Sequence, residues 1–326
     1  MIEIKPYTPG CLEEWDRFVD DSKTPLFMFK RGFMDYHSDR FVDASLMFYY
    51  NSELIAILPA SLHNNELRSH GGLTYGGFIC GDRMKQYIMI DCFNGLKEFC
   101  LCHGIYSILY KNIPYIYHKK PAQDDLYALF CSGAKLKSVS PTTVIDLLNP
   151  CKMAKGRKAQ ISRAQREKVE VKEFVNIKAF MELENKVLQE HHGVSAVHTY
   201  KELQLLHDRF PNNIICVGGF LNEKLIAGAL LFRYQNVVHT QYLAADEKAR
   251  EIGALDYVIS YCLKKYESNV RYFDFGTSQN PNGGGMNTGL KAQKEGFGGR
   301  SVAQVQFIIS LSEGDMNEQK RIIDGL

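Results

Sequence analysis

The sequence predicts an α/β (α+β) protein made of two related domains in tandem, each with a mixed β-sheet flanked by helices. The segments NSELIAILPAS (residues 51–61) and NEKLIAGALLF (residues 222–232) share Asn, Leu-Ile-Ala and a turn that leads into an apolar run. Such a turn between apolar runs is a hairpin signal in both places. Similar helix and strand patterns surround the two segments in the same order, which indicates an internal duplication.

Helix patterns precede and follow each hairpin. Apolar residues recur at helical spacing within residues 12–19 before the first hairpin and within residues 177–187 before the second. A further apolar stripe follows each hairpin, within residues 89–100 and residues 255–266, and leads to the short strands IYSILY and RYFDFG. Each half is therefore expected to contain a helix, a strand hairpin, a strand, a helix and a strand.

A basic segment marks the expected joint between the halves. Residues 152–173 contain eight Lys and Arg against three Glu, directly after Asn149-Pro150, where regular structure breaks. We expect an N-terminal domain over residues 1–150 and a C-terminal domain over residues 151–326. As a helix the joint is polar almost all round, so it is either a solvated connector or a contact to an anionic partner.

The composition is that of a globular protein. Of 326 residues, 45% are hydrophobic and 23% charged, and no run of 18 apolar residues occurs. The N-terminus MIEIKPYTPG lacks the order of a secretory signal, so we expect a soluble, cytoplasmic protein. Nine cysteines without a CxxC pair favour reduced thiols, and the adjacent His191 and His192 cannot share a helical face, so no metal site is expected.

Three stretches of the sequence are informative when taken in order: the basic joint GRKAQISRAQREKVEV, the phrase HHGVSAVHTYKELQLLHDRFP and the ending DFG…GLKAQKEGFGG. With them the chain resembles, over nearly its whole length, the double-domain, Fem-like (FemAB-type) branch of the GNAT acyltransferase superfamily. The most specific parts of this resemblance are Asp274-Phe275-Gly276 and the Lys-x-x-Phe-Gly that begins at Lys294. The resemblance implies tandem GNAT-like domains, with a degenerate N-terminal domain and the active-site cleft in the C-terminal one.

The resemblance also implies a reaction. An acyl group, acetyl or aminoacyl, would move from a carrier to an amine on a small-molecule or lipid-linked acceptor, such as a cell-envelope polysaccharide or peptidoglycan precursor. Acyl-coenzyme A is the expected donor; an aminoacyl-tRNA donor is less favoured because no helical hairpin arm is inserted in the second half. No DNA partner, transmembrane segment or metal is expected. The alternative is a non-catalytic GNAT-like module that binds an anionic glycan precursor.

The expected donor site lies where the strand VVHTQYLAAD leads into a helix. The resemblance places a phosphate-binding turn at Arg250, Gly253 and Ala254, because small residues at a helix start let a diphosphate approach backbone N–H groups. Leu255 stands where a small residue is expected, and Glu251 would oppose a diphosphate. A helix start with a solvated arginine is the alternative for this motif.

Strand alternation suggests a polar pair on the strand before that helix. It puts His239 and Gln241 on one face and Thr240 and Tyr242 on the other. A neutral imidazole can take the proton that an attacking ammonium must lose, so His239 is a candidate catalytic residue and Gln241 and Tyr242 are candidate substrate-binding residues. Satisfaction of these groups by neighbouring backbone is the alternative.

Asp274 ends the last strand of the RYFDFG segment. It is expected on the face opposite Phe273 and Phe275, either as a general base or amine anchor, or as a cap of the following loop.

The glycine-rich stretch after Asp274 is expected to form a loop over the mouth of the cleft. Ser278 and Asn287 are its candidate substrate-binding residues, and Asn287 or Thr288 can cap a short helix. On that helix the resemblance implies that Lys294 neutralises charge on the donor or on a developing oxyanion. Lys291 does not match the motif and provides the comparison.

Overall fold

The structure, a computed structural model, describes residues 2–280 and 285–311. The chain forms two compact units, Met1–Ser140 with Ala303–Leu326, and Pro141–Val302. Strands β9 (Lys135–Asp146) and β15 (Arg300–Ser310) each run from one unit into the other. The expected second domain reached the C-terminus, whereas the described residues from Ala303 onward pack with the first unit, because β15 pairs there with β8.

The first unit contains two sheets. The order of the first is β1-β3-β4-β7, all antiparallel, and in the second β15 pairs with β8, which is followed by β6, β5 and β2. The strands are β1 (Ile2–Pro6), β2 (Val42–Asp43), β3 (Leu46–Tyr50), β4 (Glu53–Leu58), β5 (Ser61–His63), β6 (Glu66–Arg68), β7 (Ile79–Cys80) and β8 (Ser107–Lys111). The helices are α1 (Leu12–Asp21), α2 (Arg31–Met34), α3 (Gln86–Cys102) and α4 (Asp124–Cys131), with 3-10 turns at Pro9–Cys11, Phe27–Phe29, Asp35–His37 and Tyr115–Tyr117. The apolar stripe of α3 supplies much of this unit's core.

The second unit contains one mixed sheet in the order β10-β11-β12-β13-β14-β9. The β13–β14 pair is parallel and the other pairs are antiparallel. Its other strands are β10 (Glu170–Phe174), β11 (Ile214–Leu221), β12 (Lys224–Arg233), β13 (Val237–Ala245) and β14 (Tyr272–Thr277). Its helices are α5 (Lys155–Arg166), α6 (Ile177–His192), α7 (Tyr200–Arg209), α8 (Glu247–Ile252), α9 (Ala254–Tyr266) and α10 (Thr288–Gly296).

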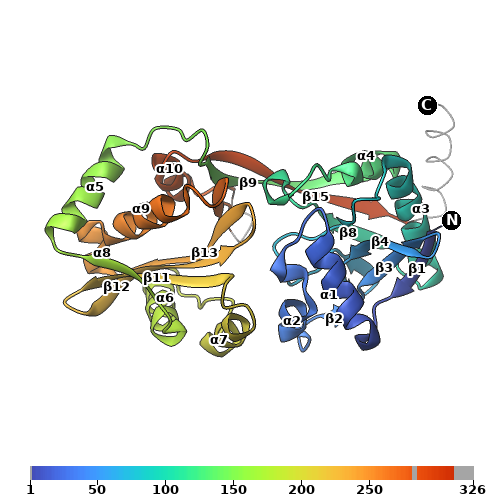
Figure 1. Ribbon diagram of the computed structural model, residues 1–326, viewed down its shortest axis with the longest axis horizontal. Coiled ribbons are helices and arrows are strands. Elements are labelled where there is room, and N and C mark those ends of the chain that lie inside the picture. Colours follow the sequence, from blue (N-terminus) through green and yellow to red (C-terminus); the bar gives the residue numbers. More distant parts are fainter. Residues whose placement is uncertain (1, 281–284, 312–326) are drawn as a thin grey trace. The chain divides into compact units, whose positions relative to one another are not determined.

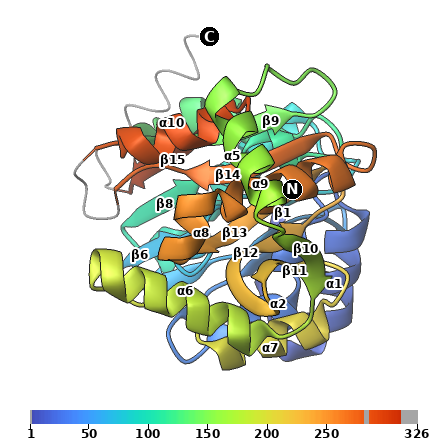
Figure 2. The same cartoon turned by 90° about the vertical axis from the view of Figure 1, so that its left-hand side faces the viewer.

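Helices cover both faces of this sheet. Figures 1 and 2 show α6 and α7 on one face and α5 and α9 on the other. A Cβ at Gly228 would meet Phe180 of α6, and a Cβ at Gly219 would meet Val258 of α9, which fixes the side on which each helix lies. We call these the α6 face and the α9 face.

The two predicted hairpins form with the same turn. Asn51 and Ser52 join β3 to β4 with φ values of 50° and 65°, and Asn222 and Glu223 join β11 to β12 with φ values of 48° and 65°. Two successive residues with positive φ define the tight turn that suits the twist of a hairpin. The predicted mixed sheets with flanking helices are therefore present in both units, and the shared turn geometry fits a duplication.

A β-bulge interrupts β13. Leu231 pairs with Thr240 but Leu230 pairs with Tyr242, so Gln241 is an extra residue in the strand. The bulge places His239 and Tyr242 together on the α6 face, where uninterrupted alternation predicted opposite faces. That prediction was wrong because alternation holds only while the ladder stays in register.

Strands β13 and β14 pair only over their first residues. In the parallel register Val237 pairs with Tyr272 and His239 pairs with Asp274. Beyond these residues β13 and β14 do not pair with each other. The bulge at Gln241 and the left-handed conformation of Gly276, with φ of 69°, follow directly after the last pair. The sheet is therefore opened between these two strands.

Candidate functional site

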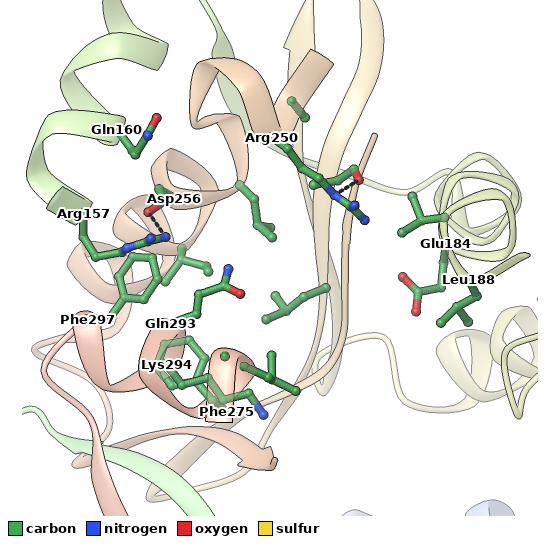
Figure 3. Close-up of a pocket in the computed structure, with 18 residues that line it drawn as sticks. Arg157, Gln160, Glu184, Leu188, Arg250, Asp256, Phe275, Gln293, Lys294 and Phe297 are labelled. Carbon is green, nitrogen blue, oxygen red and sulfur yellow. Dashed lines mark hydrogen bonds and ion pairs between the residues drawn. The ribbon is translucent and has the colours of Figure 1, made fainter. Parts of the chain in front are cut away.

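A pocket of about 630 Å³ lies in the second unit where β13 and β14 part. Leu243 and Ala245 of β13 and Phe275 of β14 line it on the two strands. Helices α5, α6, α8, α9 and α10 supply the other lining residues, which are Arg157, Gln160, Glu184, Val187, Leu188, Ala249, Arg250, Leu255, Asp256, Ile259, Gly289, Leu290, Gln293, Lys294 and Phe297 (Figure 3). A mostly apolar pocket with a few polar groups is the common form of a small-molecule site.

Lys294 lines this pocket and is buried, with 6% of its surface exposed. Its Nζ donates to the backbone O of Thr277 at 2.7 Å and of Gly276 at 3.3 Å. Burial lowers the pKa of Lys294 to about 8, against an opposing effect of Asp274. Lys294 is therefore not a solvated surface lysine, and its ammonium group lies at the end of β14 beside the opening of the sheet.

Lys291 is also buried, with 5% of its surface exposed, but it is absent from the pocket lining. Its Nζ donates to Thr143 Oγ1 at 3.0 Å and Ser301 Oγ at 2.8 Å, and Glu295 lies 3.5 Å away. These contacts join α10 to β9 and β15. The two lysines of α10 thus have different surroundings, one at the pocket and one in the framework.

The structure brings two predicted catalytic residues together. His239 Nδ1 lies 3.1 Å from Asp274 Oδ2, because the two residues are register partners in the parallel pair. Asp274 Oδ1 accepts the backbone N–H of Gly276 at 2.7 Å, so Asp274 both contacts the histidine and caps the turn, the two roles that the sequence left open. Neither residue is in the pocket lining. Both are on the α6 face, opposite Phe275.

The candidate substrate residues of β13 lie near this pair. Tyr242 Oη is 2.7 Å from His198 Nδ1 and accepts the backbone N–H of His198 at 3.3 Å. Burial, with a smaller effect of Glu184, raises the pKa of Tyr242 to about 12, so its hydroxyl stays protonated. Gln241 is half-buried at the bulge. Whether either residue contacts a substrate stays a prediction.

The predicted phosphate-binding turn joins two helices. Gly253 lies between α8 and α9, where it caps both helices with a φ of 77°. A Cβ at this position would lie 2.6 Å from the backbone O of Gln160. A side chain would be strained by this φ and would also clash with α5, so the position requires glycine. Ala254 opens α9, and Arg250 lines the pocket while its Nε donates to the backbone O of Ala245 at 3.1 Å.

The two departures from the expected turn have different consequences. Glu251 is exposed and forms ion pairs with Lys248 at 3.1 Å and Arg163 at 3.5 Å, so its charge is partly balanced on the surface. Leu255 lines the pocket and adds apolar surface to it. Gly253 and Ala254 are outside the pocket lining, so phosphate binding at this turn stays a prediction.

The basic joint forms α5 and packs against α9. Arg157 Nη1 donates to Asp256 Oδ1 at 2.7 Å, and both residues line the pocket. Burial raises the pKa of Asp256, although Arg157 opposes the shift. Gln160 Oε1, in the same lining, has no hydrogen-bond partner among the described residues. One side of the joint is thus part of the pocket, which its sequence pattern did not reveal.

The stretch after β14 is described at its two ends. Ser278 is fully buried, and its Oγ has no hydrogen-bond partner within the described part of the chain. Asn287 caps α10, accepting the backbone N–H of Leu290 at 2.9 Å, as one of the two predicted caps. The expected loop over the cleft falls mostly on residues 281–284, which lie outside the described residues.

Glu184 is a pocket residue that the sequence pattern did not single out. It lies on α6, is 5% exposed and lines the pocket. Burial raises its pKa to about 7. Its place in the sequence, between Leu183 and Asn185, gave no signal beyond a polar residue near an apolar stripe.

Two negative findings apply to residues 2–280 and 285–311. No cluster of three or more His, Cys, Asp or Glu side chains could hold a metal ion there. No helix in these ranges is both long and apolar enough to cross a bilayer.

Comparison with known proteins identifies the class. Residues 154–282 match the family model of the acetyltransferase (GNAT) domain. The chain is similar in structure to FemX, with a TM-score of 0.69 and 13% identity over 96% of this chain and 98% of that one. It is also similar to L-PGS from Bacillus licheniformis (TM-score 0.63, 12% identity, 97% of each chain) and to a tandem GNAT protein from the clavulanic acid biosynthesis pathway (TM-score 0.53, 12% identity, 96% of this chain and 99% of that one). No curated protein matches the sequence.

These findings confirm the predicted fold class and the resemblance to the Fem-like GNAT branch. The second unit therefore contains a GNAT domain over residues 154–282, and the protein is an N-acyltransferase.

Proposed function

We propose that this N-acyltransferase moves an acyl group from acyl-coenzyme A to an amine, in the pocket of the second unit. The observation that carries the proposal is the opening between β13 and β14. Pairing of the two strands stops at His239 and Asp274, and a pocket of about 630 Å³ follows. Leu243 and Phe275 flank it with apolar surface, which suits a narrow thioester arm.

The phosphate end of the donor would lie at the start of α9. Backbone N–H groups at the start of α9 lie at the positive end of a helix, beside Arg250 and Leu255 of the pocket lining, whereas Gly253 itself packs against Gln160 of α5. Arg250 adds a cation in the pocket lining, and the side-chain N–H groups of Gln160, in the same lining, are donors that suit a phosphate. These residues fit a phosphate-bearing carrier.

Lys294 would act at the reacting carbonyl. When the amine nitrogen attacks the thioester carbon, a C–N bond forms and negative charge develops on the carbonyl oxygen; the C–S bond then breaks and the thiolate leaves. An ammonium group held by the O atoms of Gly276 and Thr277 is fixed in position and stabilises such a charge more strongly in a buried site than in water. Asp274 positions the same turn through the Gly276 N–H.

The acceptor in this proposal is an amine on a cell-envelope sugar or peptide precursor. The resemblance to the Fem-like branch supports it, and one structural neighbour is described as the C-terminal domain of a putative lysylphosphatidylglycerol synthetase from Agrobacterium fabrum (TM-score 0.60, 11% identity, 97% of this chain and 95% of that domain). An aminoacyl-tRNA is the second candidate donor, since the exposed side of α5 carries Lys155 and Lys158. The match to an acetyltransferase domain favours both over a non-catalytic module.

Calorimetric titration with acetyl-coenzyme A tests the donor. We expect saturable binding to the wild-type protein and at least tenfold weaker binding to Arg250→Ala, because one phosphate-facing cation is lost. Lys248→Ala is the matched control, since Lys248 is an exposed cation on the same helix and is outside the pocket lining. The proposal fails if neither acetyl-coenzyme A nor aminoacyl-tRNA binds saturably to the wild type.

A further inference from the structure

Glu184 is a buried carboxylate with a free oxygen in the pocket. The apolar stripe of α6 turns towards the sheet, and Glu184 lies on that side of the helix with 5% of its surface exposed. Its Oε2 is shielded from solvent and has no hydrogen-bond partner among the described residues. Figure 3 shows Glu184 and Leu188 on the side of the pocket away from Arg157 and Phe297.

Burial of such a carboxylate destabilises the folded state. A buried polar atom without a partner costs about 1–3 kcal/mol, and a buried charge costs more. Burial is the cause that raises the pKa of Glu184, to about 7, and no ion pair of Glu184 is found in the described residues. A structural carboxylate would be paired, so an unpaired one aimed into a pocket indicates a ligand that supplies the missing donor.

The other charged and titratable groups around the pocket come from five elements, β13, α8, α10, α5 and α9. On the α6 face, burial raises the pKa of Tyr242 of β13, and Glu184 is near enough for its carboxylate to raise that pKa further. The hydroxyl of Tyr242 is hydrogen-bonded to His198 Nδ1. Arg250 of α8 and Lys294 of α10 also line the pocket. The Nε of Arg250 and the Nζ of Lys294 donate to backbone carbonyls.

Across the pocket from Glu184, α5 and α9 contribute Arg157 and Asp256, which form an ion pair at 2.7 Å. They therefore face the pocket as a neutralised pair. The geometry thus offers one carboxylate without a cation on the α6 side of the pocket.

The two sides of the pocket would serve different substrates. The donor features, namely the start of α9, Arg250 and Gln160, belong to α5, α8 and α9. Glu184 belongs to α6, on the other face of the sheet, and the parted strands β13 and β14 lie between. A nucleophile that approaches from the α6 side would meet the donor carbonyl at the opening of the sheet.

We propose that Glu184 binds the acceptor amine as its ammonium ion and then removes the proton that the nitrogen must lose before attack. The inference rests on the proposed acyl transfer. In this step an N–H bond breaks, the proton passes to the carboxylate of Glu184, and the nitrogen lone pair becomes free to form the C–N bond. A second nitrogen proton goes to the departing thiolate, so protons and charges balance.

Glu184 fits this role better than His239. The imidazole of His239 contacts the buried carboxylate of Asp274 and is outside the pocket lining, whereas Glu184 lines the pocket with a free oxygen. A carboxylate also selects the acceptor class. An ammonium ion supplies both the charge and the donor that Glu184 lacks, whereas a neutral hydroxyl supplies a donor only, so the site should prefer primary amines over alcohols.

The test uses acetyl-coenzyme A with glucosamine and with alanylalanine as amine probes. Glu184→Gln keeps the shape of the side chain and removes the base. We expect kcat/KM to fall about 10²–10³-fold, with the affinity for acetyl-coenzyme A unchanged. In the wild type the rate should rise with pH through about 7, because the carboxyl must be ionised, and the variant should lack this limb.

Glu182→Gln is the matched control. Glu182 lies on the same helix, is exposed and pairs with Lys178 at 3.8 Å, so the same chemical change there should leave activity and pH profile unchanged. The inference is overturned if Glu184→Gln keeps activity within threefold of the wild type or retains the pH limb. If the wild type bound neither acetyl-coenzyme A nor aminoacyl-tRNA saturably, the proposed function itself would be refuted.

If neither probe is acetylated, a measurement of thermal stability tests whether Glu184 binds an ammonium ion. Melting temperatures at pH 8 are compared in glucosamine hydrochloride and in sodium chloride of equal ionic strength. Protection of the wild type by glucosamine, absent from Glu184→Gln, supports an ammonium site at Glu184. An equal response of the two proteins overturns it. The variant should fold, because a neutral amide avoids the cost of an ionised carboxylate in this cavity.

Discussion

Replacing Lys294 with methionine should separate catalysis from stability. Methionine keeps the length and apolar contacts of the lysine stem and removes the ammonium group. If Lys294 stabilises negative charge on the reacting carbonyl, the loss of one such preorganised donor should cost about 2–4 kcal/mol of transition-state stabilisation, or roughly 10²–10³-fold in kcat.

The effect on folding can be worked from the pKa. The pKa falls from 10.5 to about 8 in the folded protein, and 2.5 units at 1.36 kcal/mol each correspond to about 3 kcal/mol. Because the folded-state value is the lower one, the ammonium form weakens folding below pH 8, and stability returns as pH rises from about 8 to 10.5. Methionine removes this penalty.

Loss of the hydrogen bonds that Lys294 donates should destabilise the folded variant. Bonds from the ammonium to the O atoms of Gly276 and Thr277 contribute about 1.5–3 kcal/mol each in mutational series, so the two effects largely offset. We therefore expect the free energy of unfolding of Lys294→Met at pH 7 to be lower than that of the wild type by no more than about 3 kcal/mol, with kcat reduced about 10²–10³-fold. Initial rates of thiol release from acetyl-coenzyme A and urea unfolding curves give the two quantities.

Lys291→Met provides the contrast on the same helix. Its ammonium binds Thr143, Ser301 and Glu295 in the framework, so its removal leaves buried hydroxyls without a donor and should cost about 1–3 kcal/mol of stability. The turnover of its folded fraction should stay near the wild-type value. Equal kcat in both variants, or an activity loss in Lys294→Met that follows its folded fraction, would refute a catalytic Lys294.

Three further predictions concern the surroundings of the pocket. Gly253→Ala should lower stability by about 2 kcal/mol or more, since its φ of 77° is left-handed and the methyl would lie 2.6 Å from a backbone oxygen of α5; a melting temperature equal to the wild type would contradict this contact. Asp274→Asn should cost about 1.5–3 kcal/mol in urea unfolding, because a charged acceptor of the Gly276 N–H is lost, and an unchanged midpoint would disprove it. If the exposed side of α5 contacts an anionic donor, replacing Lys155 and Lys158 together with Gln should flatten the salt dependence of donor binding; an unchanged slope would assign these residues to a solvated face.

The duplicated architecture could be predicted from local sequence patterns. Hairpin turns depend on local backbone preferences, so Asn51 and Asn222 could be recognised from their neighbours alone, and both adopt the positive φ that such turns need. Helical periodicity likewise located α1, α3, α6 and α9, because each buries one stripe against a sheet. The cap at Asn287 is also local and was predicted.

The arrangement of the candidate residues could not be predicted in this way and is known from the folded structure. His239 and Asp274 are far apart in sequence and meet because β13 and β14 are parallel neighbours, while the bulge at Gln241 reversed the expected face of Tyr242. The two lysines of α10 look alike in sequence, yet one reaches the end of β14 and the other reaches β9. A bulge or a register depends on the partner strand, which local sequence does not specify.

Glu184 shows the same limit most clearly. Along α6 it is one acidic residue among several, and helical spacing places it beside the apolar stripe without saying what the stripe covers. Its burial and its free oxygen arise because α6 packs under the point where β13 and β14 part, and those strands lie much later in the chain. The desolvation that raises its pKa comes from atoms of distant segments, so the chemistry of this carboxylate exists only once the chain is folded.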